Sequence, residues 1–511
     1  MDFLVLLVHG SLLWAVIYAI LCCIAVILFW ELFSPLHAFP GPPAARFTNI
    51  WRAMVTASGH VDQANIKWHR TYGSAVRVGP NTISINDPEL IRTIYATKNP
   101  WPKSDMYRTN DVLINGVRLS NLFNTQDNHW HDTYMNPIRS LWTMTKVLDM
   151  ESLIDETLNK FTAKMDVKFA DVEHNCMMDE WLGYFAWDVM ANISFGKHYG
   201  FIDEERDVEN LIADSTKGLY YFAPISQIPW LDCLLDKNLI KRIGPKPTLT
   251  GVNYAIDVVT TYHQALGSGS GRVEHYLDKY VKLKEAHPKI MDDNQVVNYL
   301  MLNILAGGDT TSSTMRAVVY YLSKNTSAYQ KLISELDAAN FSLPAKWRDI
   351  RKLTYLDAVV QEALRINPGI AMILERVVPQ SGFTLPDGRF IPGGTAIGIN
   401  PAVTNRNVDV FGQDADHFNP DRWLKKDEEN EEEFRDRCRK MKDVASFVFG
   451  GGNRVCMGRN LAILEIYKLF ATLYSLFDIK LVNNDHSWKY HNAWFVYQYN
   501  IPMTVSRRVK T

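Results

Sequence analysis

The composition excludes several classes of protein, because some residue types are scarce and the positive and negative charges nearly balance. The 511 residues carry 54 Lys+Arg and 56 Asp+Glu, a formal charge of −2, so no positive excess favours nucleic acid. Glycine and proline, at 28 and 22, are too few for a collagen-like chain, and 47% hydrophobic residues exclude wholesale disorder. No internal repeat and no dinucleotide- or flavin-binding motif is evident. We therefore expect a globular protein with a deep core.

Cysteine is also scarce. The six cysteines form no C-x-x-C pair, and they are Cys22, Cys23, Cys176, Cys233, Cys438 and Cys456. This number and spacing exclude a disulfide framework and a zinc ribbon, and favour a reducing compartment. A cysteine that takes part in chemistry must therefore be recognised from its neighbours.

Charged side chains are absent from residues 3–30. As a helix this stretch would measure roughly 42 Å, more than the ~30 Å hydrocarbon core of a bilayer, so it predicts a tilted transmembrane helix. A cleaved signal peptide is the alternative, although Asp2 stands where signal peptides carry positive charge. The predicted domains are an N-terminal membrane anchor at 1–30, a proline-rich hinge at 31–45 and one catalytic body at 46–511.

Helical spacing of apolar residues dominates the body. It extends over residues 143–305, and residues 292–325 predict one long helix with Asp292 or Asp293 as its cap. The dense mixed charge of residues 425–442 is most simply a solvated loop.

Strand signals are confined to a few short segments. Residues 75–78 and 82–85 predict a β-hairpin that turns at Gly79-Pro80-Asn81, and residues 383–399 predict short strands. Because helical spacing dominates and strand signals are few, the predicted fold class is mostly α with a small β part (α+β). No long linker divides the chain.

The strongest chemical pattern is Phe-x-x-Gly-x-Arg-x-Cys-x-Gly, from Phe449 to Gly458. Three consecutive glycines starting at Gly450 permit a tight turn whose amide N–H groups can point at the sulfur of Cys456 and lower its pKa. Gly458 allows a flat ligand to approach closely, and Arg454 can reach a carboxylate at its rim. The alternative is a buried cysteine that merely follows a glycine turn.

This segment resembles the haem-binding loop of the cytochrome P450 superfamily. The resemblance implies the P450 fold and haem b as cofactor, with Cys456 as the axial thiolate ligand of the iron and Phe449 packed beside the sulfur. It also implies that NADPH supplies electrons indirectly, through a separate NADPH–cytochrome P450 reductase.

A second motif, Ala306-Gly307-Gly308-Asp309-Thr310-Thr311, lies in the middle of the predicted long helix. A glycine pair disfavours a helix by about 1 kcal/mol per residue, so it needs a reason. The resemblance supplies one, a local widening where dioxygen binds beside Ala306, with Thr310 as the proton-relay residue and Asp309 as its neighbouring acid. A threonine hydroxyl bonded to its own helix is the alternative.

The resemblance assigns structural roles to three charged residues. Glu362 and Arg365 lie three residues apart on one helix face, and Arg422 follows Pro420 in a later aromatic–proline–arginine segment. In the family such residues form a buried structural network; an exposed Glu–Arg pair, in contrast, would contribute well under about 1 kcal/mol.

Haem propionates are expected to meet Arg376 and the region around Trp130. The family usually carries Trp-x-x-x-Arg there, but this sequence has Tyr134 at the arginine position. Anchoring from this side would then rest on Trp130, on His131 or Tyr134, or on no residue at all. A purely structural histidine is the alternative for His131.

Within the superfamily, the sequence is similar to fungal microsomal enzymes of the pisatin-demethylase-like kind. This implies a single-pass protein of the endoplasmic reticulum membrane with a cytosolic catalytic domain. It also implies oxidation of a lipophilic molecule in secondary metabolism, such as a terpenoid, polyketide or alkaloid. Detoxification of a plant defence compound, an isomerase or dehydratase that uses no dioxygen, and a tethered binding or electron-carrier protein are the alternatives.

The expected pocket is lined by aromatic and aliphatic segments. These are residues 107–123, 220–230, Ala306, 370–373 and 494–497.

Overall fold

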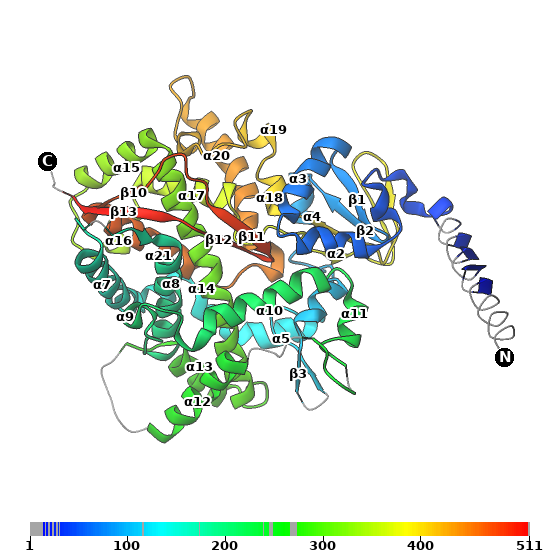
Figure 1. Ribbon diagram of the computed structural model, residues 1–511, viewed down its shortest axis with the longest axis horizontal. Helices are drawn as coiled ribbons and strands as arrows, with labels where there is room; N and C mark the ends of the chain where they lie inside the picture. Colours follow the sequence, from blue (N-terminus) through cyan, green and yellow to red (C-terminus); the bar gives the residue numbers. More distant parts are fainter. Residues whose placement is uncertain are drawn as a thin grey trace, which may run out of the picture.

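The computed structural model describes residues 14–508, except 16, 19–20, 23–24, 27–28, 30, 115–116, 173, 239, 245–248 and 266–272. Helices make up most of the described chain, and the strands are short (Figure 1). The predicted fold class, mostly α with a small β part, is confirmed.

The helices up to the centre of the chain are α2 (Asn49–Ala57), α3 (Val61–Tyr72), α4 (Ile91–Ile94), α5 (Asn128–Arg139), α6 (Met144–Leu148), α7 (Glu151–Lys168), α8 (Met178–Phe195), α9 (Phe201–Glu204), α10 (Leu211–Ile225), α11 (Pro229–Leu234), α12 (Leu249–Ala265) and α13 (Tyr276–Ala286). The later ones are α14 (Asp293–Lys324), α15 (Thr326–Ala338), α16 (Trp347–Ile350), α17 (Thr354–Ile366), α18 (Pro401–Thr404), α19 (Val408–Phe411), α20 (Glu431–Ala445) and α21 (Arg459–Leu476).

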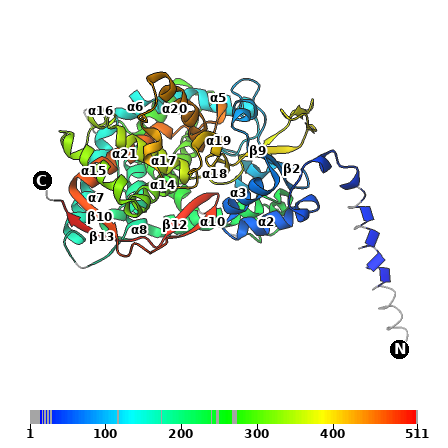
Figure 2. The ribbon, with the colours of Figure 1, turned by 90° about the horizontal axis from the view of Figure 1, so that it is seen from above.

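The strands form one four-stranded sheet and several smaller ones. The largest sheet has the order β1 (Ala75–Gly79), β2 (Thr82–Ile85), β9 (Ala396–Ile399), β6 (Arg376–Val377). A second has the order β10 (Phe477–Leu481), β13 (Pro502–Arg507), β5 (Cys176–Met177). The pairs are β3 (Val112–Ile114) with β4 (Val117–Leu119), β7 (Phe383–Thr384) with β8 (Phe390–Ile391), and β11 (Lys489–Ala493) with β12 (Phe495–Tyr499). In both views β1, β2, α2 and α3 lie at one end of the helical body and β10 and β13 at the other (Figures 1 and 2).

The long central helix α14 confirms the helix predicted for residues 292–325. Asp292 caps it by accepting a hydrogen bond from the Gln295 N–H at 2.8 Å, which satisfies one donor of the first turn. Helix α8 packs along it, and the two glycines lie at this contact. A Cβ at Gly307 would lie 2.4 Å from the Met190 sulfur, and one at Gly308 would lie 2.6 Å from the Trp187 ring. Close helix packing therefore requires the glycine pair, and α14 continues through it as a helix.

The predicted hairpin is also present. β1 and β2 pair antiparallel, and all of their residues are buried because β9 extends the sheet and helices cover it. Helix α20 corrects the loop predicted for residues 425–442 from Glu431 onward, whereas residues 425–430 precede the helix as a loop. A capping box between Asn430 and Glu433 starts this helix, and its apolar side, with Met441 and Val444, is buried. The charged residues cover the opposite, solvated side of a helix rather than a loop.

The membrane prediction requires correction. Within the part of the chain that the structure describes, no helix is both long and apolar enough to cross a bilayer. The assignment to the endoplasmic reticulum membrane is therefore wrong on this finding. Much of the span predicted at residues 3–30 lies outside the described residues.

Residues 31–46 form two short 3-10 helices, Pro35–Ala38 and Pro43–Arg46, that pack on the body. Phe39 is fully buried, and the Arg77 N–H donates to the Pro40 carbonyl at 2.9 Å. The buried Arg77 guanidinium also forms an ion pair with Glu31 at 2.8 Å. A hinge function for residues 31–45 remains a prediction.

Candidate active site

A cavity of about 1290 Å³ lies next to the middle of α14. It is lined by Ala306, Gly307 and Thr310 of that helix and by the loop that contains Cys456. Of the segments predicted to line a pocket, residues 107–123 contribute most. Only Tyr221 and Phe222, both on α10, do so from residues 220–230.

The Cys456 loop is shaped by its glycines. Gly450 and Gly452 have φ values of +76° and +63°, a region that residues with a Cβ rarely adopt. A Cβ at Gly452 would also lie 2.2 Å from the Tyr95 carbonyl oxygen, so the loop can pack this closely only with glycine there. The Cys456 N–H donates to the Phe449 carbonyl at 2.7 Å, which closes the turn.

The Cys456 thiol has accessible surface and lines the cavity. Although Cys456 is accessible from the cavity, the surrounding protein separates its sulfur from bulk water, and this desolvation raises its pKa. Hydrogen bonds from the backbone N–H groups of Gly458 and Arg459 partly counter that rise. These donors lie at the start of α21, where the helix end also favours an anion. The loop is thus prepared to hold a thiolate, provided that a cation bound in the cavity offsets the effect of burial.

Three basic side chains, Lys103, Arg376 and Arg454, line the cavity and are close enough to repel one another. Lys103 and Arg376 are buried, and the Nε of Arg454 is buried without a hydrogen-bond partner. Among the described residues, none of the three has an ion pair. Buried cations without counter-charges are costly, so the cavity wall fits a ligand with more than one carboxylate. A haem, with two propionates at its rim, has this chemistry.

Trp130 and Phe449 also line the cavity. The Arg459 guanidinium lies 5.5 Å from the centre of the Phe449 ring. Gly450 and Gly458 contribute backbone to the same wall, and a Cβ at Gly458 would lie 3.9 Å from the Cys456 sulfur. The structure thus places every residue predicted to contact the cofactor on one cavity.

Thr310 and Asp309 are neighbours in sequence but face different surroundings. Thr310 lines the cavity. Its hydroxyl donates to the Ala306 carbonyl at 2.7 Å, which is the bond within its own helix expected as the alternative to a proton-relay role. The buried Asp309 carboxylate accepts from Trp187 Nε1 at 2.9 Å and from the Tyr497 hydroxyl at 2.8 Å. A weaker bond from Ser215 measures 3.3 Å, and burial raises the Asp309 pKa despite these donors.

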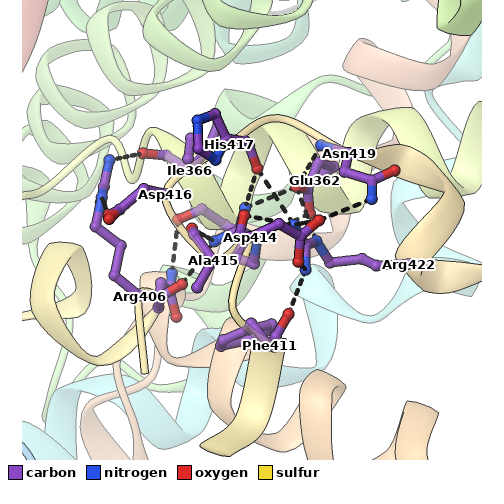
Figure 3. Close-up of polar contacts among 12 residues, drawn as sticks. Glu362, Ile366, Arg406, Phe411, Asp414, Ala415, Asp416, His417, Asn419 and Arg422 are labelled. Atoms are coloured by element: carbon purple, nitrogen blue, oxygen red, sulfur yellow. Dashed lines mark hydrogen bonds and ion pairs between the residues drawn. The ribbon is translucent and has the colours of Figure 1, made fainter. Parts of the chain in front are cut away.

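Glu362 and Arg422 meet in a buried network outside the cavity (Figure 3). Arg365 forms an ion pair with the same Glu362 carboxylate. Arg365 donates to both carboxylate oxygens of Glu362, at 2.8 and 2.7 Å, and Arg422 Nε donates to one of them at 3.0 Å. The Trp423 indole N–H and the Asn419 backbone N–H donate to the same carboxylate. Backbone carbonyls accept from the remaining guanidinium N–H groups of Arg365, so this network has the satisfied geometry that a buried charge requires.

Sequence reasoning missed Lys103 and Glu465, which line the cavity. It expected Tyr497 on the pocket wall, but the Tyr497 hydroxyl instead binds Asp309. Neither Lys103 nor Glu465 belongs to a spaced motif, so only the folded chain identifies them.

Comparison with known proteins identifies the family. The family model "Cytochrome P450" matches residues 40–501. The chain belongs to the cytochrome P450 family. It is 33% identical to cytochrome P450 monooxygenase cfoH of Aspergillus candidus, over 95% of this chain and 91% of that protein. It is 35% identical to cytochrome P450 monooxygenase cicH of Emericella nidulans, over 90% and 92% of the two chains. Cytochrome P450 monooxygenase mfmA of Annulohypoxylon moriforme is 34% identical, over 93% and 92%.

The protein is therefore a P450 monooxygenase and not a tethered carrier. Its family implies a haem cofactor and electrons supplied by a redox partner. The residues that line the cavity fit such a group, because they combine one accessible cysteine with three basic side chains that lack ion pairs among the described residues.

Proposed function

We propose that this P450 holds haem b through Cys456 and oxidises a lipophilic small molecule with dioxygen and electrons that a separate reductase draws from NADPH. When bound, the haem supplies the oxygen-activating chemistry. The observation that carries the proposal is the position of Cys456. It lies on the cavity wall, in a glycine turn closed by the bond from its N–H to the Phe449 carbonyl, and two backbone N–H groups donate to its sulfur.

In this proposal, residues of the chain hold the cofactor and exclude water from the substrate. The N–H groups of Gly458 and Arg459 moderate the charge on the Cys456 sulfur. Arg376 and Arg454 bind the propionates, and the apolar wall, with Trp494 and Phe495, excludes water from the substrate.

Protons reach the cavity through α14. The Thr310 hydroxyl can rotate from the Ala306 carbonyl and hold a proton at Oγ1 on the cavity side. Asp309, whose pKa burial raises, can exchange a proton with the Tyr497 and Ser215 hydroxyls that touch it. A hydroxyl and a neighbouring acid with a raised pKa suit general acid catalysis.

The substrate class follows from the cavity wall. Tyr107, Phe123, Phe222 and Trp494 form one cluster of edge-to-face rings, with centroids 5.5–5.8 Å apart. Such a surface favours a hydrophobic, ring-containing molecule. Together with the fungal relatives, it supports a role in the biosynthesis of a fungal secondary metabolite.

Replacing Cys456 with serine tests the haem ligand. We expect C456S to lose the thiolate-type absorption of the ferrous–carbon monoxide complex and all NADPH-dependent oxidation, because a serine hydroxyl does not supply a soft anionic ligand. Cys438, on α20 and outside the residues that line the cavity, provides the control, and C438S should keep both properties. A C456S protein with the wild-type spectrum would contradict the assignment.

Replacing Thr310 with alanine tests proton delivery. With a substrate found by its binding-induced spectral shift, we expect T310A to form about tenfold less product per NADPH consumed, and to release the difference as reduced oxygen species. Thr314, one turn further along α14 and also on the cavity wall, is the control. Equal coupling in wild type and T310A would show that the hydroxyl does not act as the relay.

A further inference from the structure

Helix α5 carries no basic residue at position 134, where the Trp-x-x-x-Arg pattern predicts an arginine. Four residues after Trp130 the chain carries Tyr134, whose ring lies against the Trp130 ring with centroids 4.3 Å apart. The neighbouring His131 lines the same cavity, but burial and the charge of Arg454 lower its pKa to about 4. Near neutral pH His131 is therefore uncharged, and α5 presents no cation here.

Lys103, which precedes the 3-10 helix Asp105–Asn110, reaches this wall from another part of the chain. The side chain is buried, and its ammonium donates to the Phe123 carbonyl. The same ammonium lies 4.2 Å from the centre of the Tyr107 ring and 4.5 Å from that of Phe123. None of these three partners carries a charge, so they leave the positive charge of the ammonium without a counter-ion.

Two carboxylates near this wall, Glu375 and Asp127, are already engaged. Glu375 accepts from the Arg52 guanidinium and, at 2.6 Å, from the Ser104 hydroxyl. Asp127 caps α5, where one of its oxygens accepts from the N–H groups of His129 and Trp130. Neither carboxylate forms an ion pair with Lys103 in the described structure.

Lys103 is also held next to Arg376. The two residues form an antiparallel backbone bridge, and the charges of Arg376 and Arg454 both act on the Lys103 ammonium. Burial and these two cations lower the Lys103 pKa well below its usual value. A protein keeps three such cations together only where an anion neutralises them, since a buried charge without a partner is strongly unfavourable.

We propose that Lys103 binds a haem propionate beside Arg376 and Arg454, and that it replaces the arginine absent at position 134. This inference rests on the proposed function, because that function places the haem in the cavity. Lys103 acts here as a cofactor-binding residue supplied by the segment before α5 rather than by α5 itself.

The test measures how firmly the loaded protein holds its haem. Wild type and K103M, K103R and K103M/Y134R variants are mixed with excess apomyoglobin, and the rate of haem transfer is followed. The propionate bending modes are recorded by resonance Raman spectroscopy. Lys289, an exposed lysine that lines the same cavity, supplies the matched control K289M.

We expect K103M to lose haem about tenfold faster than wild type and to shift a propionate bending mode, because a charge-assisted bond is removed. K103R and K289M should stay near the wild-type rate. K103M/Y134R should recover most of the loss, since an arginine one turn after Trp130 restores the charge without restoring the contact to Phe123.

Two results would overturn the proposal. One is a K103M protein that retains haem as long as wild type. The other is faster loss with unshifted propionate modes and no recovery in K103M/Y134R, which would assign Lys103 to packing against Tyr107 and Phe123. The ferrous–carbon monoxide spectrum of the wild type separates the two hypotheses. If it lacks the thiolate signature the proposed function fails, whereas a normal spectrum with an unaffected K103M rejects the Lys103 assignment alone.

Discussion

Glu465, on α21, is a carboxyl group enclosed without a polar partner. The residue has no exposed surface, and in the described structure both of its oxygens lack a hydrogen bond. Burial alone raises its pKa well above the usual value, so the folded protein holds the proton more tightly than the unfolded chain does. Stability from this group is complete below the unfolded pKa and is lost as the pH rises through the folded pKa.

Replacing Glu465 with glutamine should remove this pH dependence. We expect the free energy of unfolding of wild type, relative to E465Q, to fall by up to about 1.4 kcal/mol per pH unit as the pH rises above the usual glutamate pKa of 4.5. Urea unfolding midpoints of both proteins over this range measure the difference. The exposed Glu428 gives the control E428Q, which should follow wild type. Parallel curves for wild type and E465Q would show that Glu465 is not protonated in the folded state.

At the scale of elements, the Glu362 carboxylate joins α17 to the segment that precedes α20. It accepts from Arg365 on its own helix and from Arg422, Trp423 and Asn419. Arg365 also donates to the carbonyls of residues 405, 415 and 417, so it connects α17 to three points of this segment. Figure 3 shows Ala415, His417 and Asn419 of the segment around Glu362. The family's structural assignment for these residues remains a prediction until the network is broken.

Changing Glu362 to glutamine should destabilise the protein by about 3–5 kcal/mol, because two guanidinium groups lose their shared charge in a buried site. An exposed pair of the same spacing, Asp436 and Arg439 on α20, provides the contrast, and D436N should change stability by less than about 0.5 kcal/mol. Thermal unfolding of both holo proteins is the measurement. Equal midpoints for E362Q and D436N would show that burial does not strengthen the Glu362 network.

At the scale of the whole molecule, residues 31–46 attach to the lobe formed by β1, β2, α2 and α3. A Cβ at Gly41 would lie 2.1 Å from the Arg77 carbonyl oxygen, so this segment runs against β1 with no room for a side chain. Phe39 fills a fully buried site next to the Arg389 guanidinium, whose centre lies 4.9 Å from its ring.

Truncating Phe39 should therefore release this segment. We expect F39A to reduce stability by about 3–5 kcal/mol and to speed tryptic cleavage after Arg46, since a large buried ring is lost. Phe47, which is 41% exposed, supplies the control, and F47A should change stability by about 0.5 kcal/mol or less. Unchanged proteolysis in F39A would mean that the ion pair between Glu31 and Arg77 holds the segment by itself.

Local patterns predicted much of the fold and part of the site. The hairpin of β1 and β2, helix α14 with its Asp292 cap, and the turn before Cys456 are each set by residues close together in sequence. Helix α20 was missed because a run of charges looks alike in a loop and on one side of a helix, and only burial of its apolar side separates the two.

Residues close together in sequence were enough to predict helix α14, the turn between β1 and β2, and the glycine turn that holds Cys456, because those features depend on neighbours within a few residues. Tertiary structure alone decided that Lys103 meets Arg376 and Arg454, that Asp309 binds Tyr497, and that Glu465 has no polar partner in the described chain. The physical reason is that charge pairing and desolvation depend on groups brought together from distant segments, and no local pattern encodes those contacts.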